Sequence, residues 1–327
     1  MQIIFVELIN SDTMIHEKEM ADQDVAGAAS LDSAEDYRAR VAHYKRHYEP
    51  IASGGPDDPE HEFSYIKCIE NGKQIIMNKI KGYMPGRVAQ FITNCCHCHW
   101  TTKKKLFLTR HGQSEYNAMG RIGGDPDLTE MGERYALALK DFAESAICRD
   151  LETGKELPAR LWTSSLKRTR RTARHIANPT IIRDGYPWIQ MKPRIWSNLD
   201  EIYAGACDGM TYREIEEQFA KEAIARKKDK LTYRYPRGES YLDVIQRLEP
   251  LIQEIERHRE PLIIVGHQGV LRMIKAYYKG IPREEAPHQT LKLNHVTELI
   301  PHAYGCDEKL YNLLPDETPG DDGQTKH

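Results

Sequence analysis

Three short apolar runs, each followed by charged or hydroxyl-bearing residues, predict buried strands of an α/β sheet. The runs and the residues after them are Leu106–Leu108 before Arg110 and His111, Leu161–Trp162 before Ser164, Ser165 and Arg168, and Leu262–Val265 before His267 and Gln268. Ligands bind beyond the carboxyl ends of strands in open α/β sheets. If the three ends converge, two histidines and two arginines meet in one crevice and can bind an anion.

Cap residues and apolar spacing predict helices between and after these strands. The predicted helices begin after Thr129, Thr211, Ser240 and His267. Thr211 is followed three residues later by glutamate, which is the chemistry of a capping box. Pro250 lies within the long segment that Ser240 opens, and we expect it to kink that helix or mark a break.

The first hundred residues carry a different pattern, which predicts the closing part of an α/β domain. The expected elements are a strand at Ile3–Val6, a helix at Asp36–Tyr48, and a hairpin formed by Tyr65–Ile69 and Gln74–Met77. Asn71 and Gly72 join the hairpin strands and suit a tight turn, because both residue types accept positive φ.

Composition indicates a globular protein that binds a small anion. The 327 residues are 40% hydrophobic and carry a formal net charge of −3, which argues against a nucleic-acid partner. Basic residues crowd between Lys167 and Arg174 and between Arg226 and Arg237, which suits a small polyanion. The sequence shows no membrane span or signal peptide, and its seven scattered cysteines fit reduced thiols, so we expect a cytoplasmic protein without membrane contact.

The cluster Cys95-Cys96-His97-Cys98-His99 suggests zinc by residue type, but its spacing argues against it. Neighbouring residues of an extended segment point to opposite faces, whereas zinc sites join separated ligand pairs. We therefore interpret the segment as a linker with buried or half-buried thiols. Lys103, Lys104 and Lys105 are interpreted as solvated charge before a strand.

The motifs at the strand ends resemble the histidine phosphatase (phosphoglycerate-mutase-like) superfamily. They are Arg110-His111-Gly112 with Asn117, Ser165 to Thr169, Glu201 within Asp200 to Gly205, and Gly266-His267-Gln268. Four further stretches resemble the bisphosphatase half of the 6-phosphofructo-2-kinase/fructose-2,6-bisphosphatase family, namely Gly120–Asp125, Met210–Ile215, Tyr233–Tyr241 and Val244–Pro250. The resemblance implies a three-layer α/β fold with a mostly parallel sheet, preceded by a partial kinase-like segment.

The first hundred residues resemble the end of the kinase half of the same family. The motifs are Phe5–Glu7, His47–Pro50, Tyr65–Lys67 and Met77–Lys79. We expect a truncated kinase-like segment at 1–102, a bisphosphatase domain at 103–312 and a disordered tail at 313–327. The sequence contains no Gly-x-x-x-x-Gly-Lys-Ser/Thr loop to hold nucleotide phosphates, so kinase activity is not expected.

The resemblance also implies chemical roles for the polar residues. His111 would attack phosphorus and form a phosphohistidine, His267 would contact the transferring group, and Arg110 and Arg168 would bind its oxygens. Glu201 would protonate the leaving alkoxide, and burial and the charge of a bound bisphosphate would favour its protonated form.

One residue near Glu201 departs from the family pattern. Tyr203 stands where that pattern leads us to expect aspartate.

By the same resemblance, phosphate and sugar would be held by Arg110, Asn117, Gly123, Arg168, Tyr212, Arg226, Lys230, Tyr241, Gln268 and Arg272. Taken alone, Arg226 and Lys230 would suit an exposed charged helix or loop, and Tyr212 and Tyr241 could be packing aromatics. No metal and no cofactor are expected, because arginine and histidine supply the charge stabilisation.

These expectations together indicate hydrolysis of fructose 2,6-bisphosphate to fructose 6-phosphate through phospho-His111, a step that would regulate glycolysis against gluconeogenesis. Two alternatives stay open. One is a phosphoglycerate mutase or a broader sugar phosphatase. The other is a non-catalytic partner that pairs with a complete kinase chain. As to partners, pairing of the chain with itself in a homo-oligomer is also open.

Overall fold

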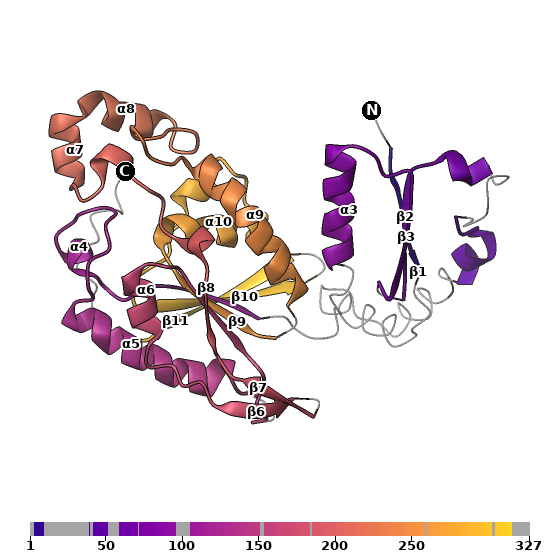
Figure 1. The fold of residues 1–327 in the computed structure, drawn as a ribbon, viewed down its shortest axis with the longest axis horizontal. Coiled ribbons are helices and arrows are strands. Elements are labelled where there is room, and N and C mark those ends of the chain that lie inside the picture. Colours follow the sequence, from indigo (N-terminus) through magenta and orange to yellow (C-terminus); the bar gives the residue numbers. More distant parts are fainter. Residues whose placement is uncertain are drawn as a thin grey trace. The chain divides into compact units, whose positions relative to one another are not determined.

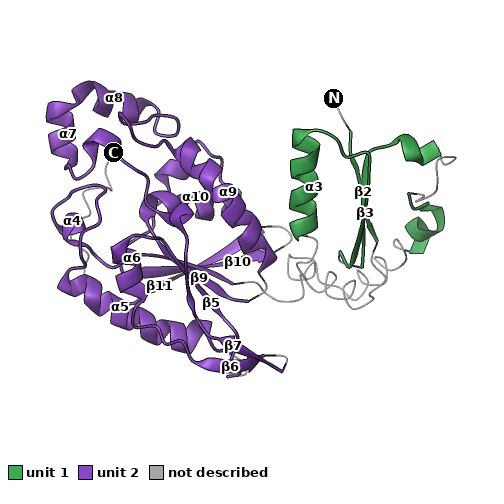
Figure 2. Ribbon diagram, viewed as in Figure 1, with its two compact units in different colours: residues 1–102 green, residues 103–327 purple. Residues whose placement is uncertain are grey.

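The chain forms two compact units, residues 1–102 and 103–327, which Figure 2 shows in separate colours. The structure, a computed structural model, describes residues 3–9, 39, 42–51, 59–70, 72–95, 105–150, 154–183, 185–258, 260–302 and 305–315. Within these ranges, no helix has both the length and the apolar character needed to cross a membrane.

The first unit is a small sheet with one packed helix (Figure 1). Its elements are β1 (Phe5–Ile9), the 3-10 turn η1 (Pro59–Glu62), β2 (Tyr65–Ile69), β3 (Gln74–Asn78) and α3 (Tyr83–Cys95). β1 runs parallel to β2, and β2 and β3 pair antiparallel, which confirms the predicted hairpin. Ile66 and Cys68 of β2 pack on Ala89 of α3 to form the core of this unit.

Three predictions for the first unit need correction or lie partly outside the described residues. The first strand is Phe5–Ile9 and not Ile3–Val6, because its ladder follows the length of β2, with Phe5 opposite Tyr65 and Ile9 opposite Ile69. Residues 42–47 are helical, as predicted, whereas the expected start of that helix lies outside the described residues. The same holds for most of the cysteine-histidine cluster, since the description of that stretch ends at Cys95.

The second unit is built on a six-stranded sheet with the order β11-β10-β4-β9-β5-β8. Its strands are β4 (Leu106–Arg110), β5 (Arg160–Thr163), β6 (Thr180–Arg183), β7 (Tyr186–Ile189), β8 (Pro193–Ile195), β9 (Leu262–Gly266), β10 (His295–His302) and β11 (Gly305–Asn312). β4, β9, β5 and β8 run parallel, and β10 and β11 add an antiparallel edge. β6 and β7 form a separate antiparallel pair. The sheet is therefore mostly parallel, as predicted.

Helices cover both faces of this sheet (Figure 1). The helices are α4 (Glu115–Ala118), α5 (Glu130–Phe142), α6 (Lys167–Ala173), α7 (Tyr212–Gln218), α8 (Ala220–Lys228), α9 (Tyr241–Arg257) and α10 (Gln268–Lys279), with short turns η2 (Ala143–Ile147), η3 (Ser197–Leu199), η4 (Gly205–Cys207) and η5 (Ala286–His288). Side chains alternate along a strand, so Leu106 and Leu108 pack with α9 and α10, while Phe107 packs with α5. This alternation produces the predicted three layers.

The predicted helix starts are confirmed in the second unit. Thr129 caps α5 by accepting a hydrogen bond from the amide of Gly132. Thr211 and Ser240 cap α7 and α9 with complete capping boxes. Pro250 lies on the exposed side of α9 and the helix continues to Arg257, so a break at this proline is wrong.

A smaller apolar cluster lies apart from the two main layers, around α7 and α8. Its buried members are Ala204, Cys207, Ile215 and Tyr235. Near the end of the described chain, Leu313 and Leu314 pack against the cluster that contains α5, and residues 316–327 of the expected tail lie outside the described residues.

Candidate active site

The ends of β4, β9 and β5 lie side by side and bring the two predicted histidines together. The amide of His111 donates to the carbonyl of Gly266 over 3.0 Å, and the ring centroids of His111 and His267 are 5.2 Å apart. A pocket of about 370 Å³ opens beside them. Of the predicted residues, those that line it are Arg110, His111, Asn117, Gly123, Arg168, Glu201, Tyr212, Arg226, Lys230, Tyr241, Gln268 and Arg272, while His267 lies behind His111.

The imidazole of His111 is fixed in one tautomer by the backbone. Nδ1 lies 2.8 Å from the carbonyl oxygen of Gly112, which can only accept, so Nδ1 carries the proton and Nε2 has a free lone pair. Burial, Arg168 and Arg110 together hold the pKa of His111 well below its usual range. The ring is therefore neutral at pH 7 and nucleophilic at Nε2.

His267 is completely buried, and one of its nitrogens is held by hydroxyl groups. Nε2 lies 2.7 Å from Oγ of Ser164, which in turn lies 2.8 Å from Oγ1 of Thr169. Burial and the neighbouring Arg168 and His111 hold the pKa of His267 well below its usual range. Nδ1 is also buried and has no hydrogen-bond partner among the described residues.

Two buried guanidinium groups flank the histidines. Arg110 donates to the carbonyl of Leu291 over 3.1 Å. Arg168 donates to the carbonyl of Gly124 over 2.5 Å and lies 3.6 Å from the carboxylate of Asp125. We call Arg110, His111 and Arg168, together with the adjacent buried His267, the deep end of the pocket. It combines neutral nucleophilic rings with fixed positive charge, which suits a phosphoryl group.

Helix α4 and the loop after it bring further groups to the pocket. Oδ1 of Asn117 accepts hydrogen bonds from the amide and hydroxyl of Ser114, which completes the cap of α4 and leaves its Nδ2 as a donor. Gly123 adopts a φ of 70°, and a Cβ there would lie 1.7 Å from Oδ1 of Asp208. The positive φ and this contact favour glycine, which lets the loop pack closely on Asp208.

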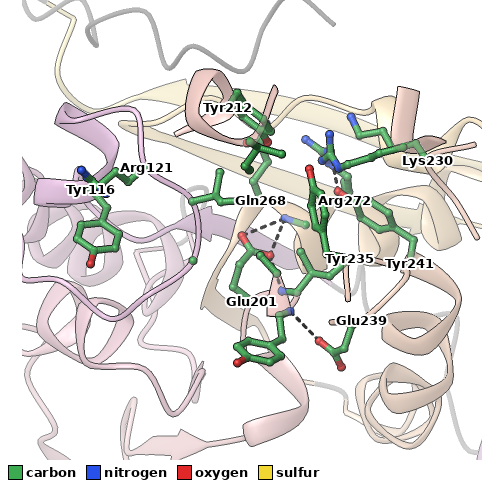
Figure 3. A pocket seen from close by; sticks show the side chains of 18 of the residues that line it. Tyr116, Arg121, Glu201, Tyr212, Lys230, Tyr235, Glu239, Tyr241, Gln268 and Arg272 are labelled. Atoms are coloured by element: carbon green, nitrogen blue, oxygen red, sulfur yellow. Dashed lines mark hydrogen bonds between the residues drawn. The ribbon is translucent and has the colours of Figure 1, made fainter. Parts of the chain in front are cut away.

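Glu201 lies on the pocket wall opposite the start of α10 (Figure 3). Its Oε1 accepts hydrogen bonds from the amides of Ile202 and Gly269 over 3.0 and 3.1 Å. A Cβ on Gly269 would lie 2.4 Å from the same oxygen, so the carboxylate fits closely against the helix. The close fit holds the carboxyl group of Glu201 in one position on the pocket wall.

A second group of cations lines the pocket away from the histidines. The guanidinium of Arg226, on α8, lies 5.5 Å from the ring centre of Tyr212 and 5.8 Å from that of Tyr235. Burial, Arg272 and Arg226 lower the pKa of Lys230 to about 8. We call Tyr212, Arg226, Lys230 and Tyr235 the outer end of the pocket. Its cations repel one another and are stabilised by an anion.

Helices α9 and α10 connect the two ends. Arg272 donates from one nitrogen to the hydroxyl of Tyr241 over 3.0 Å and to the carbonyl of Pro287 over 2.5 Å. Figure 3 shows Arg272 and Tyr241 beside Lys230, with Gln268 nearer to Glu201. Tyr241 is thus a polar pocket residue that is also part of the core, which combines the two interpretations of its sequence position.

The pocket also contains residues that sequence reasoning missed, including Tyr116, Arg121, Tyr235, Glu239 and His288. Arg121 and Tyr235 lie within Gly120–Asp125 and Tyr233–Tyr241, two stretches that resemble the family. The family resemblance was therefore the signal that could have identified these two residues. His288 belongs to η5, for which the sequence pattern gave no element. Among the described residues, no group of three or more histidine, cysteine, aspartate or glutamate side chains is arranged to hold a metal ion.

The chain belongs to the histidine phosphatase superfamily (branch 1), whose sequence model matches residues 106–314. Residues 1–99 match the model of 6-phosphofructo-2-kinase. Both matches confirm the resemblances found in the motifs.

Among individual relatives, the chain is 41% identical over 323 residues to an Arabidopsis thaliana 6-phosphofructo-2-kinase/fructose-2,6-bisphosphatase, which covers 96% of this chain and 39% of the relative. It is 38% identical over 272 residues to a Saccharomyces cerevisiae fructose-2,6-bisphosphatase, with 83% and 53% covered. A Caenorhabditis elegans 6-phosphofructo-2-kinase/fructose-2,6-bisphosphatase is 37% identical, with 96% and 64% covered. The chain thus spans 39 to 64% of the length of these relatives.

Solved structures agree on the fold. An Escherichia coli protein described as a putative alpha-ribazole-5'-P phosphatase matches with a TM-score of 0.52 and 23% identity, over 64% of this chain and 96% of its own. A mycobacterial glucosyl-3-phosphoglycerate phosphatase matches with a TM-score of 0.50 and 23% identity, over 64% and 98%. At this identity the likeness shows the fold alone.

Proposed function

We propose that this chain hydrolyses fructose 2,6-bisphosphate to fructose 6-phosphate and inorganic phosphate. The observation that carries the proposal is one pocket with cations at both ends, Arg110 and Arg168 beside the histidines and Arg226 and Lys230 at the outer end. A bisphosphorylated sugar supplies two anionic groups, and the names of the relatives agree with this substrate. The proposal places the protein in the cytoplasm. Among the described residues, the free cysteines Cys68, Cys148, Cys207 and Cys306 fit a reducing compartment.

The first chemical step forms a phosphohistidine. Nε2 of His111 attacks phosphorus, the bond from phosphorus to the sugar 2-oxygen breaks, and Glu201 in its protonated form gives that oxygen a proton. Arg110, Arg168 and Asn117 bind the equatorial oxygens, and His267 lies close enough to His111 to contact the same group.

The second step returns the enzyme to its starting state. Water attacks the phosphorus of the phosphohistidine, the Glu201 carboxylate accepts the proton of that water, and the bond from phosphorus to Nε2 breaks. Inorganic phosphate leaves, and Glu201 is again protonated. Tyr212, Arg226, Lys230, Tyr241, Gln268 and Arg272 hold the sugar and its second phosphate, with the backbone of Gly123 beside them.

The test measures phosphate release from fructose 2,6-bisphosphate, with the acid-labile phosphoprotein trapped in parallel. We expect the wild type to release phosphate and to become labelled, and His111→Ala to do neither. Labelling from 2,3-bisphosphoglycerate without hydrolysis of the sugar bisphosphate would favour a mutase instead. A chain that neither labels nor hydrolyses would favour a regulatory partner of a complete kinase chain.

Kinase activity is not part of the proposal, since the sequence has no nucleotide-binding loop of the kind that this chemistry needs.

A further inference from the structure

An ion pair between Glu239 and Arg247 holds the loop that carries Glu201. Arg247, on α9, donates from Nε to Oε1 of Glu239 over 3.0 Å and from Nη2 to Oε2 over 3.2 Å. The two side chains are only 28% and 20% exposed. A forked pair in such a setting is better ordered than a solvated surface pair. We call this pair the clamp and residues 198–205 the acid loop.

The clamp touches the acid loop on both sides of Glu201. Before Glu201, Arg247 donates to the carbonyl of Asp200 over 2.7 Å and to the carbonyl of Asn198. After Glu201, Oε2 of Glu239 accepts from the amide of Tyr203 over 2.9 Å, and the amide of Glu239 donates to the carbonyl of Tyr203 over 2.9 Å (Figure 3). The backbone around the carboxylate is therefore fixed from two directions.

The position of Glu201 depends on small movements of this backbone. Its carboxylate lies against the amide of Gly269 with no room for one additional carbon atom. The loop is also tied toward Arg168, because the carboxylate of Asp200 accepts from the amide and hydroxyl of Ser165 over 2.7 and 2.6 Å. A shift of the loop would thus move the proton donor relative to the deep end of the pocket.

We propose that the clamp of Glu239 and Arg247 is a positioning device for the general acid, which holds Glu201 where it can protonate the leaving oxygen. The inference rests on the proposed function, because it requires phosphoryl transfer with Glu201 as the acid. Arg247 is not among the residues that line the pocket, so its variant reports on the acid loop alone, whereas Glu239 also lines the pocket and its variant is read together with that of Arg247.

The experiment compares two leaving groups in the full chain. The sugar alkoxide of fructose 2,6-bisphosphate needs a proton as it leaves, whereas the phenolate of p-nitrophenyl phosphate leaves without one. The test variants are Glu239→Gln and Arg247→Lys, and Glu201→Gln serves as the reference for a lost acid. The matched control is Arg234→Gln, which removes another forked pair with a carboxylate of α9, Asp243, without touching the acid loop.

We expect both clamp variants to lower the single-turnover rate of phosphohistidine formation from the sugar bisphosphate by about 10- to 100-fold, the cost of displacing a catalytic group by about 1 Å. The rate of phosphohistidine formation from p-nitrophenyl phosphate should stay within about threefold of the wild type, as it should for Glu201→Gln, because this rate does not include the second step, in which Glu201 accepts the proton of water. The double variant Glu201→Gln/Arg247→Lys should be no slower on the sugar bisphosphate than Glu201→Gln alone. Arg234→Gln should match the wild type on both substrates.

Equal losses in the rate of phosphohistidine formation from both substrates, or additive losses in the double variant, would overturn the inference and assign the clamp a purely structural role. The conservative Glu239→Gln keeps the size of the side chain, so it reports on the clamp even if Arg247→Lys fails to fold. If the wild type cleaves p-nitrophenyl phosphate and another alkyl phosphate but not the sugar bisphosphate, the proposed substrate is wrong, and the clamp is judged on that alkyl phosphate. If the wild type cleaves none of them, both proposals are wrong.

Discussion

The deep and outer ends of the pocket are built in different ways. At the deep end, Arg110, His111 and Arg168 are almost fully buried at strand ends or on a helix that follows one, and main-chain atoms hold them. At the outer end, Arg226 lies on α8, a helix without buried residues, and is held by the faces of two aromatic rings. Under the proposed function, the sheet would hold the reacting groups in place, and helix α8 would supply a cation for the second anionic group.

The largest effect is expected from His267→Ala, which removes a group from the deep end. We expect kcat for fructose 2,6-bisphosphate to fall about 10²- to 10³-fold, the usual loss when a preorganised transition-state contact is deleted. KM should stay within about threefold, because the outer end still holds the second phosphate. Steady-state kinetics measure both. A large rise in KM with an unchanged kcat would contradict the division between the two ends.

The opposite pattern is expected from Arg226→Ala at the outer end. KM for the bisphosphate should rise about 10- to 150-fold, equivalent to the loss of ~1.5–3 kcal/mol for a hydrogen bond to a charged group, and kcat should be kept. The control is Lys228→Ala, which removes an equal charge from an exposed position of the same helix and should leave KM unchanged. Equal effects of the two variants would mean that α8 acts only through its long-range charge.

A smaller effect is expected from pH, through Lys230. Its pKa of about 8 in the empty pocket means that the amine loses its proton as pH rises through 8, whereas a bound phosphate requires the charged form. KM for the bisphosphate should therefore rise above pH 8, by up to ~10-fold per pH unit. Lys230→Arg should flatten this rise, because arginine stays charged. KM measured from pH 6.5 to 9 decides the matter, and an unchanged slope in the variant would assign the titration elsewhere.

The smallest effect is expected from Tyr203→Asp, which restores the residue of the family pattern. The side chain of Tyr203 is 52% exposed, and its contacts with Glu239 run through the backbone. We expect kcat within about twofold of the wild type, in keeping with the ~0.5 kcal/mol limit of most surface substitutions. A loss above tenfold would show that the phenol itself supports the acid loop.

How far the sequence predicted this molecule depended on the surroundings of each residue. β4 and β9 are apolar on both faces, so their runs were legible, and the histidines at their ends could be placed together. β10 was missed because its alternation is interrupted by Glu298, which is buried and paired with Lys105 and Tyr311. Local patterns do not show partners that are distant in sequence.

The same limit applies to the site. His111 and His267 could be predicted because a short motif holds each of them, whereas Glu239 and Arg247 act on main-chain atoms of another loop. No side-chain pattern in the sequence encodes such a contact. Pro250 shows the reverse error, since a strong local signal for a helix break is overridden by the packing of Val244, Leu248 and Leu251 of the same helix on the sheet.

The separate small cluster around α7 and α8 has a consequence for inheritance. Because Ile215 and Tyr235 pack within that cluster and not in the layers of the sheet, substitutions there need not be matched by changes around the strands. Under the proposed function, inherited changes around α7 and α8 would alter the contacts to the second anionic group and leave the two histidines at the strand ends in place.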